Sequence, residues 1–266
     1  AAYFPEFTAA EQWRHTALDR LDFELDYQVY ADGAQIELTS GYHQVSLRNW
    51  VMTMRTAWRN GIDLPDGFKS RLEKMYNYNL YVAFPDMLMP AVNDGGQTDI
   101  RSSMREGHEF FPGREDFLWA ATGGIEGTPP EDESTAFPYA GHFVLRSGWD
   151  CDNSCLFFDG GPYGYGHQHE DKLGCWLFAY GRSFLVDPGR HLYDSSEVSC
   201  MPHLRSTRAH STILIDGEGQ HSRGRPDSWI ARNPGPMQWH VGDGEIRAAA
   251  SYDLGYGEDN SIAVEH

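Results

Sequence analysis

The spacing of apolar residues changes once along this chain of 266 residues, close to residue 123. Before that point, apolar side chains recur at the period of an amphipathic helix. After it, they gather in short runs rich in β-branched and aromatic residues, which is typical of strands. Because one pattern cannot satisfy both periods, the chain should fold as a helical part followed by a strand-rich part. The length is compatible with one large domain or with two modest ones.

Several helices are expected before residue 123. The first follows a capping-box pattern made by Thr8 and Glu11, and the second ends at Gly61. Amphipathic helices joined by proline and glycine turns predict helical hairpins stacked in a ring or solenoid. The apolar positions are, in chain order, Trp13, Ala17, Leu18, Leu21 and Leu25, then Leu47, Trp50, Val51, Met54 and Trp58, then Phe68, Leu72, Met75, Tyr76, Leu80 and Ala83, with a shorter helix at 114–121.

Residues 124–138 read GIEGTPPEDESTAFP and show no apolar period, so we interpret them as a linker. They would join a helical domain (1–123) to an antiparallel β-sandwich domain (139–266). Strands are expected at 142–146, 155–158, 173–180, 183–186, 211–215 and 245–252, with turns at Tyr180-Gly181 and Asp216-Gly217.

The formal charge of -18 argues against a nucleic-acid partner and against an anionic membrane surface. No segment approaches the roughly 20 apolar residues that span a bilayer, so no membrane insertion is expected. One basic stretch stands out at 203–225, with Arg205, Arg208, Arg223 and Arg225 among three histidines. It forms either a local basic cleft or a set of scattered surface arginines.

The four cysteines contain no CxxC pair of the zinc-ribbon kind, so a cysteine-based metal site is not expected. Cys151 and Cys155 are close enough in sequence for a disulfide across a turn, and free thiols fit equally well.

A glycine-rich segment at 160–174, GGPYGYGHQHEDKLG, carries the strongest chemical signal. His167 and His169 would point to the same side of an extended segment. Asp187 follows an apolar strand, and His210 precedes another. Two imidazoles and one carboxylate suit zinc with an open position for water. Taken singly, Asp187 could instead cap a turn, and His210 could be a hydrogen-bonding histidine at a strand edge.

A second candidate lies in IELTSGYHQ, residues 36–44, where Tyr42 follows a glycine at the entry to a helix. Its phenol could project into a cleft, or it could be ordinary core material like many of the 14 tyrosines.

Together these segments resemble the heparinase II/III family of polysaccharide lyases over nearly the whole chain. The markers are ELTSGYH at 37–43, YAGHFVLRSGW at 139–149, FFDGGPYGYGHQHEDKL at 157–173, FLVDPG at 184–189, STRAHSTILIDG at 206–217 and YDLGYG at 252–257. The resemblance implies an α+β multidomain fold, with an incomplete α/α toroid followed by an antiparallel β-sandwich and a polymer in the cleft between them.

The resemblance also implies roles for single residues. Tyr42 is similar to the family's catalytic tyrosine, and His167 to the histidine that faces it. The metal ligands, for structural zinc or another divalent ion, would be His169, Asp187 and His210. Candidates for substrate binding are Arg208, Glu37 and Tyr165.

The chain departs from the family at both ends. The family carries an Asn-His pair on a helix well before the tyrosine, and Tyr42 lies too close to residue 1 for that pair to be present. The end at AVEH comes where the family's sandwich would continue. We therefore expect a fragment lacking the N-terminal part of the toroid, for which that missing segment would be a partner.

The implied reaction is β-elimination on an acidic polysaccharide that contains uronic acid, such as alginate or heparan sulfate, in a secreted or periplasmic bacterial protein. The start AAYFPEF has no signal-peptide pattern, so an export signal would have been removed or lie upstream. Two alternatives stay open: a metal-dependent enzyme that uses the His/Asp/His site for catalysis, and an acidic-glycan-binding fragment without catalysis. The particular polymer, exo or endo action and the oligomeric state are not specified by the sequence.

Overall fold

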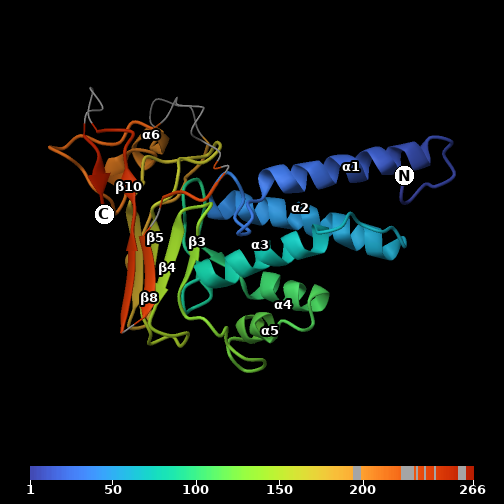
Figure 1. Ribbon diagram of the computed structural model, residues 1–266, viewed down its shortest axis with the longest axis horizontal. Coiled ribbons are helices and arrows are strands. Elements are labelled where there is room, and N and C mark those ends of the chain that lie inside the picture. The colour runs from blue at the N-terminus through green and yellow to red at the C-terminus, as the bar shows by residue number, and fades with distance from the viewer. Residues whose placement is uncertain (194–198, 223–230, 232, 237, 243, 257–261) are drawn as a thin grey trace.

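The computed structural model describes residues 1–193, 199–222, 231, 233–236, 238–242, 244–256 and 262–266. Helices come first and strands later. The helices are α1 (Ala10–Gln28), α2 (Ser40–Arg59), α3 (Phe68–Val82), α4 (Arg101–Phe110) and α5 (Glu115–Thr122), with the short α6 (Met201–Leu204) and a 3-10 turn (Thr207–Ala209) further along. In Figure 1, α1 to α5 lie on one side of the strands and point away from them.

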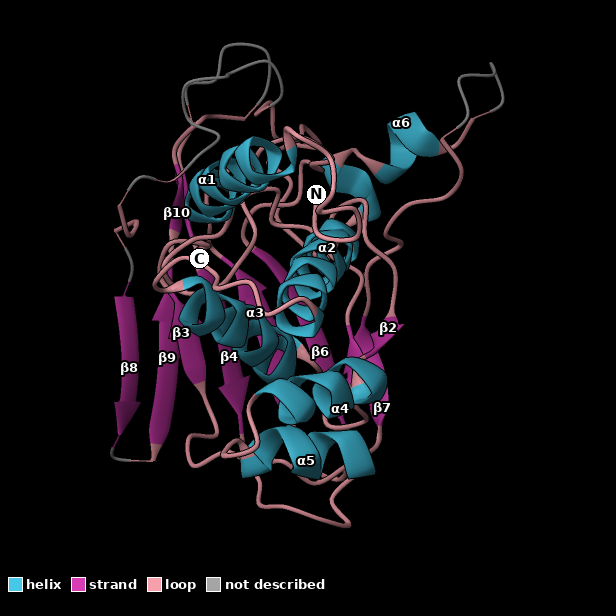
Figure 2. Cartoon of the chain, turned by 90° about the vertical axis from the view of Figure 1, so that its right-hand side faces the viewer, coloured by secondary structure: helices cyan, strands magenta, loops and turns pink. Residues whose placement is uncertain are grey.

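The main sheet has five antiparallel strands in chain order: β3 (Thr135–Phe137), β4 (His142–Arg146), β5 (Cys155–Asp159), β6 (Gly174–Ala179) and β7 (Arg182–Leu185). Three two-stranded pairs accompany it: β1 (Leu88–Met89) with β2 (Thr98–Asp99), β8 (Gln238–Gly242) with β9 (Glu245–Ala249), and β10 (Ser251–Tyr252) with β11 (Val264–Glu265). Seen from the helical side, the helices lie in front of the main sheet (Figure 2).

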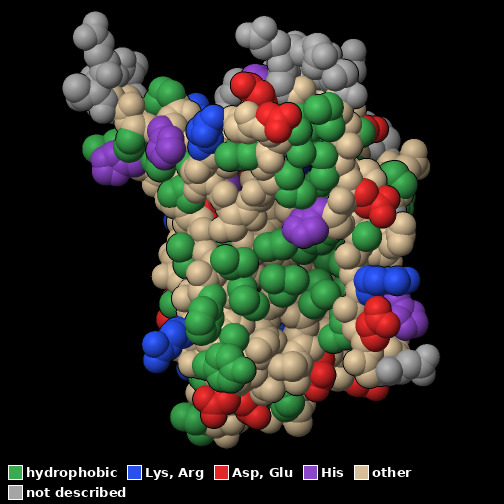
Figure 3. All heavy atoms as spheres, turned by 90° about the vertical axis from the view of Figure 1, so that its left-hand side faces the viewer, with side chains coloured by type: hydrophobic (Ala, Val, Ile, Leu, Met, Phe, Trp, Pro, Cys, Tyr) green, Lys and Arg blue, Asp and Glu red, His purple; other side chains and the backbone are tan. Residues whose placement is uncertain are grey.

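The strand register separates the two faces of the sheet. Val144, Phe157 and Trp176 lie side by side and are buried in the same core as the helices. Side chains at adjacent positions of the strands point to the other face of the sheet. There a row that is only partly covered is formed by Leu145, Leu156, Leu177 and Leu185. Figure 3 shows hydrophobic side chains gathered on the face that looks away from the helices. The strand period of two therefore separates a fully covered face from a half-covered one.

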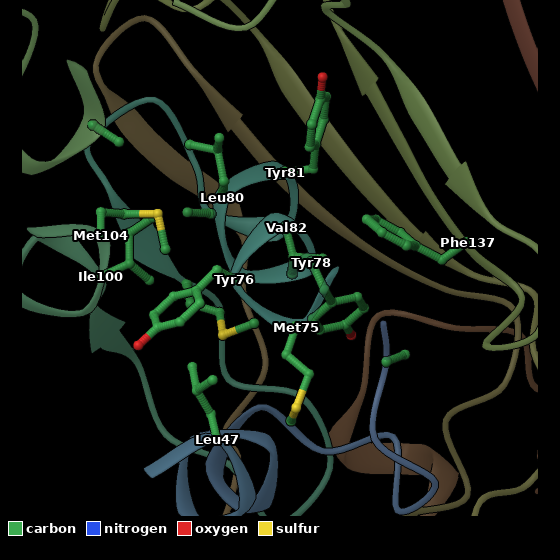
Figure 4. Packing of buried hydrophobic residues seen from close by; sticks show 14 of the residues in the cluster. Leu47, Met75, Tyr76, Tyr78, Leu80, Tyr81, Val82, Ile100, Met104 and Phe137 are labelled. Atoms are coloured by element: carbon green, nitrogen blue, oxygen red, sulfur yellow. The ribbon is translucent and has the colours of Figure 1, made fainter. Parts of the chain in front are cut away.

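Helix α3 is the centre of the core. Leu72, Met75, Tyr76 and Leu80 are completely buried, and Figure 4 shows the last three between neighbouring helices and the sheet. Burial of each such side chain contributes roughly 1.5–3 kcal/mol relative to exposure. Because Phe137 of β3 belongs to the same cluster, helices and sheet share one continuous core.

Buried Arg146 of β4 anchors the end of α3 to the sheet. Its Nη2 donates to the carbonyls of Tyr81 and Ala83 at 2.9 and 2.7 Å. A cation at a helix C-terminus satisfies carbonyls that have no partner within the helix. The guanidinium also lies over the ring of Trp149, 4.1 Å from its centroid. One side chain thus sets the position of α3 against β4.

The expected order, helices and then antiparallel strands, is confirmed at that level, whereas the toroid, the sandwich and the domain boundaries stay predictions. The capping box at Thr8 and Glu11 is wrong, because α1 begins at Ala10 with Ala9 as an N-cap that makes no side-chain hydrogen bond. Trp13 is 51% exposed whereas Leu25 is buried. Only the end of α1 nearest the sheet packs on the core. The fold therefore does not depend on a side-chain cap at the other end of this helix.

Five other differences from the expected elements follow. Helix α4 was not expected, because its sequence RSSMREGHEF is largely polar; Gly107 lets it pass close to Tyr76 and Phe117. The segment 211–215 is not a strand and makes one bridge, Ile215 with Glu218. The last residues of the expected linker form β3, and the expected strand at 245–252 is divided between β9 and β10. Strand β8 was also missed.

The structure has free thiols at Cys151 and Cys155. Among the described residues, no helix combines the length and apolar character needed to cross a bilayer.

Candidate functional site

The candidate site is built by the first turn of α2 together with loops from the helical part and the sheet part of the chain. Tyr42 lies in the first turn of α2 after an extended Thr39. The loop between α3 and α4 contributes Asn93 and Asp94, and the loop between β5 and β6 contributes His167 and His169. The loop that carries Asn93 and Asp94 lies so close to the start of α2 that residue 95 has to be glycine, because a Cβ there would lie 2.0 Å from Ser40 Oγ. The helical part and the sheet part therefore both supply side chains to one place.

Tyr42 and His167 are in direct contact. Their rings stack with centroids 3.8 Å apart and planes 16° from parallel. The His167 Nδ1 lies 2.5 Å from Glu37 Oε2, and the two side chains are 34% and 21% exposed. A carboxylate at Nδ1 favours the tautomer with the proton on that nitrogen, which leaves Nε2 able to accept a proton. A phenol and a potential base thus share one partly exposed surface.

Behind Tyr42, a chain of hydrogen bonds leads to a buried carboxylate. The hydroxyls of Tyr42 and Tyr193 are 3.0 Å apart, and Tyr193 donates to Asp94 Oδ2 at 3.1 Å. Arg205 Nη2 donates to the same oxygen at 2.8 Å, while Asp94 Oδ1 lies 2.8 Å from His169 Nε2. Although burial would raise the pKa of Asp94, the bonds from His169 and Arg205 outweigh burial and hold this pKa at about 2. Asp94 is therefore an anion that accepts three hydrogen bonds.

His169, Asp187 and His210 meet beside this carboxylate. Their candidate ligand atoms all lie within 4.8 Å of one another. His210 Nδ1 lies 2.5 Å from Asp187 Oδ2, and the two side chains are 1% and 2% exposed. Within the described part of the chain, His169 Nδ1 and His210 Nε2 are buried without a hydrogen-bond partner. A nitrogen and oxygen set with two unpartnered ring nitrogens fits a divalent ion such as zinc.

A second buried carboxylate lies close to this trio. Both oxygens of Asp171 lack hydrogen-bond partners among the described residues, and Asp171 interacts electrostatically with His210 and Asp187. On its other side, Lys172 Nζ is 3.9 Å from Asp171 and 2.6 Å from Asp159. The same polar network continues from Asp159 to His142 at 3.6 Å and then to Tyr78 of α3 at 2.9 Å. A buried polar network therefore joins the sheet to α3.

The substrate-binding candidates are not all brought to Tyr42. Glu37 is, through His167. Tyr165 has an exposed ring, and its backbone N–H donates to Ile36 O at 3.0 Å, next to Glu37. Arg208 instead donates to the carbonyl of Gly217 and lines an open cavity of about 770 Å³. Arg205 lines the same cavity and reaches Asp94. Of the other arginines in the basic stretch, Arg223 and Arg225 lie outside the described residues, as does the last glycine of YDLGYG.

Asn93, Asp94, Asp171, Tyr193 and Arg205 were not anticipated as site residues. The run Asn-Asp-Gly-Gly at 93–96 marks a loop, but nothing in it shows which segment that loop meets. Arg205 lay in the basic stretch without a specific role, and Tyr193 had no motif to distinguish it from the other tyrosines. These contacts join segments far apart in sequence, so local patterns could not reveal them.

Two family models match this chain: Heparinase II/III N-terminus over residues 1–119, and Heparinase II/III-like, C-terminal, over residues 129–264. A heparin-sulfate lyase of Pedobacter heparinus is 30% identical over 238 residues, covering 86% of this chain and 36% of that protein. A heparin-sulfate lyase of Bacteroides stercoris is 29% identical over 225 residues, covering 82% and 34%.

Among solved structures, heparan sulfate lyase HepC from Pedobacter heparinus superposes with a TM-score of 0.80 at 28% identity, covering 94% of this chain and 39% of that one. A heparinase III gene product gives a TM-score of 0.74 at 30% identity, covering 81% and 35%. The chain thus spans about a third of the length of the curated relatives it matches.

Proposed function

Since the chain belongs to the heparinase II/III family, we propose that it forms part of a polysaccharide lyase that cleaves a uronic-acid-containing glycan by β-elimination. The contact of Tyr42 with His167 is the observation that carries this proposal. In the finer fold assignment, α1 to α5 are part of an incomplete α/α toroid, and the strands belong to a β-sandwich.

β-Elimination removes the proton at C5 of a uronate and expels the sugar linked at C4. That proton is a weak acid, so the reaction needs a positioned base, a positioned acid and neutralisation of the uronate carboxylate. Tyr42 and His167 supply the two proton-transfer groups from adjacent rings. Glu37 holds His167 in one tautomer and one orientation.

The proposed substrate contacts come partly from residues beside these two rings and partly from the cavity lined by Arg208. The exposed ring of Tyr165 offers a surface on which a sugar can pack. Arg208 would hold an anionic group of the polymer in the cavity that it shares with Arg205. Arg208 thus brings positive charge to this cavity in a chain with a net charge of -18, whereas Arg205 is paired with Asp94.

His169, Asp187 and His210 would hold zinc or another divalent ion with a structural role. When bound, the ion supplies positive charge that fixes the loop carrying His167. The names of the relatives, heparin-sulfate lyases, favour a glycosaminoglycan of the heparan sulfate class over alginate. Such a polymer is extracellular, which accords with a secreted or periplasmic bacterial protein that also contains the missing N-terminal segment.

Elimination leaves a conjugated unsaturated uronate, so ultraviolet absorbance reports it directly. The full-length protein would be incubated with heparan sulfate, chondroitin sulfate, hyaluronan and alginate. We expect absorbance to rise with heparan sulfate, and to rise at least about 100-fold more slowly with Tyr42→Phe or His167→Ala. Tyr180→Phe, on an exposed turn, is the matched control. No product from any polymer, or wild-type rates with Tyr42→Phe, would refute the proposal.

A further inference from the structure

We infer that Asp94 is a positioning residue that joins the metal ligand His169 and the phenol of Tyr42 into one hydrogen-bonded unit. The inference rests on the proposed function, because it assigns a task to Tyr42. Asp94 comes from the helical part of the chain and is completely buried, so it acts through its neighbours and does not touch the polymer.

One oxygen of Asp94 determines which nitrogen of His169 faces the ion. His169 Nε2 lies 2.8 Å from Asp94 Oδ1 and, beside a carboxylate, carries the ring proton. The other nitrogen, Nδ1, is then deprotonated, and it is the one that is buried without a partner among the described residues. Metal-bound histidines commonly donate their second N–H to a carboxylate in this way, which fixes both tautomer and ring orientation.

The second oxygen of Asp94 determines the direction of the Tyr42 hydroxyl. Tyr193 donates its only O–H proton to Asp94 Oδ2. In its contact with Tyr42, the Tyr193 oxygen can therefore only accept a hydrogen bond. The proton of Tyr42 therefore points toward Tyr193, and the remaining lone pair of its oxygen points elsewhere. This order of donors, from Tyr42 to Tyr193 to Asp94, follows from the carboxylate being an acceptor only.

The backbone around Asp94 holds it in this position. Asp94 N–H donates to the carbonyl of His167 at 3.1 Å. The side chain of Asn93 accepts from the backbone N–H of His169 at 2.8 Å and donates to the carbonyl of Leu38 at 2.8 Å. Asn93 and Asp94 thus contact the histidine loop and the segment just before Tyr42 at the same time.

The alternative explanation is that Asp94 serves only as the ion-pair partner of Arg205. That explanation does not account for the contact between Asp94 and His169. Arg205 uses only Oδ2, whereas Oδ1 is committed to His169. The ion-pair explanation predicts loss of stability alone. The positioning role predicts two separable effects, one on the metal and one on turnover.

The test compares Asp94→Asn, Tyr193→Phe and the double variant in the full-length protein. Zinc affinity is measured by competition with a chromogenic chelator, and kcat and KM are measured by ultraviolet absorbance on heparan sulfate. We expect Asp94→Asn to weaken zinc binding about 10–100-fold. Tyr193→Phe should leave zinc affinity unchanged and lower kcat with little effect on KM. The double variant should lose less kcat than the product of the single losses, because both changes interrupt one chain.

Asp99→Asn, an exposed carboxylate paired with Arg101, is the matched control and should change neither quantity. Wild-type zinc affinity in Asp94→Asn, or wild-type kcat in Tyr193→Phe, would overturn the inference. The zinc measurement does not depend on elimination. If the wild-type protein releases no unsaturated product, the proposed function fails, while the zinc affinity of Asp94→Asn still supports or overturns the role of Asp94 at His169.

Discussion

The phenol ring of Tyr42 lies flat against the imidazole of His167, with ring centroids 3.8 Å apart. Tyr42 comes from the first turn of α2 and His167 from the loop between β5 and β6, so the stack joins the helical part to the sheet part. At this separation no sugar ring fits between the two. In the proposed lyase, a bound polymer would therefore meet both rings along a shared edge, and both proton transfers would occur from one side of the sugar.

Glu37 offers the most direct test of how His167 is prepared for proton transfer. Its backbone contacts with Gln35 and Gln168 do not involve its carboxylate, which contacts His167. Glu37→Gln should therefore keep the fold and lower kcat by about 10-fold or more. This loss should be smaller than the roughly 10²–10⁴-fold loss expected when a proton-transfer group itself is removed. Steady-state rates with heparan sulfate measure this. Glu109→Gln, which changes an exposed carboxylate near Arg55, is the control; equal rates in Glu37→Gln and wild type would contradict the prediction.

Metal removal should lower thermal stability as well as activity. Without an ion, the two unpartnered ring nitrogens of His169 and His210 remain buried, which costs free energy. Zinc at 100 times its Kd should raise the free energy of unfolding by about 2.7 kcal/mol. Differential scanning calorimetry with chelator and with added zinc measures the shift in Tm. In Asp187→Ala, chelator and zinc should have little further effect. A Tm that does not respond to zinc in the wild-type protein would argue against a structural ion.

Stability should fall on acidification because of buried His43. Burial lowers the pKa of His43 from 6.5 to about 4 and outweighs the hydrogen bond that its Nε2–H donates to the carbonyl of Met75, which acts in the opposite direction. The unfolded chain therefore binds a proton between pH 6.5 and 4 that the folded chain does not. The free energy of unfolding therefore falls as the pH falls through this window, by up to about 3 kcal/mol for this group. His142, with a pKa also lowered to about 4 by burial, adds to the loss.

Chemical denaturation at pH 7, 6, 5 and 4 measures that dependence. In His43→Gln the loss between pH 6.5 and 4 should be smaller, because glutamine does not titrate and can still contact the Met75 carbonyl. His15→Gln, on the exposed side of α1, should leave the wild-type dependence intact. The same pH dependence in His43→Gln and wild type would show that His43 is not responsible.

The sequence alone predicted the parts of the site that lie in short, chemically distinctive motifs. His167 and His169 stand two residues apart in a glycine-rich loop, and Asp187 and His210 border apolar segments; the structure places the last three together. Strands such as β4 were predicted because a short run rich in β-branched and aromatic residues suffices to mark them. Their roles in metal binding and catalysis stay predictions.

What sequence reasoning missed depends on tertiary contacts. Asp94 is remote in sequence from each of its partners, and its importance comes from the loop between α3 and α4 lying against the histidine loop. Helix α4 is stabilised by Met104 and Phe110 in the core and not by its mostly polar sequence. In the opposite sense, the capping box of α1 was a valid local pattern that the fold does not use.

The buried pair of Lys172 and Asp159 should contribute strongly to stability, because loss of one charge leaves the other buried without its nearest counter-charge. Their side chains are 2% and 0% exposed, with Nζ 2.6 Å from Oδ2. Asp159→Asn should lower the free energy of unfolding by about 3–5 kcal/mol, as expected when one member of a buried pair is lost. The double variant Asp159→Asn with Lys172→Met should lose less than the sum of the single changes, because both changes remove the same ion pair. Asp99→Asn breaks the exposed pair with Arg101 and should cost at most about 1 kcal/mol. Urea denaturation of the wild-type protein, Asp159→Asn, Lys172→Met, the double variant and Asp99→Asn measures each value. Equal losses for the buried and exposed pairs would mean that Lys172 reaches solvent in the folded protein, and the polar network from Asp171 to Tyr78 would then not be a buried unit.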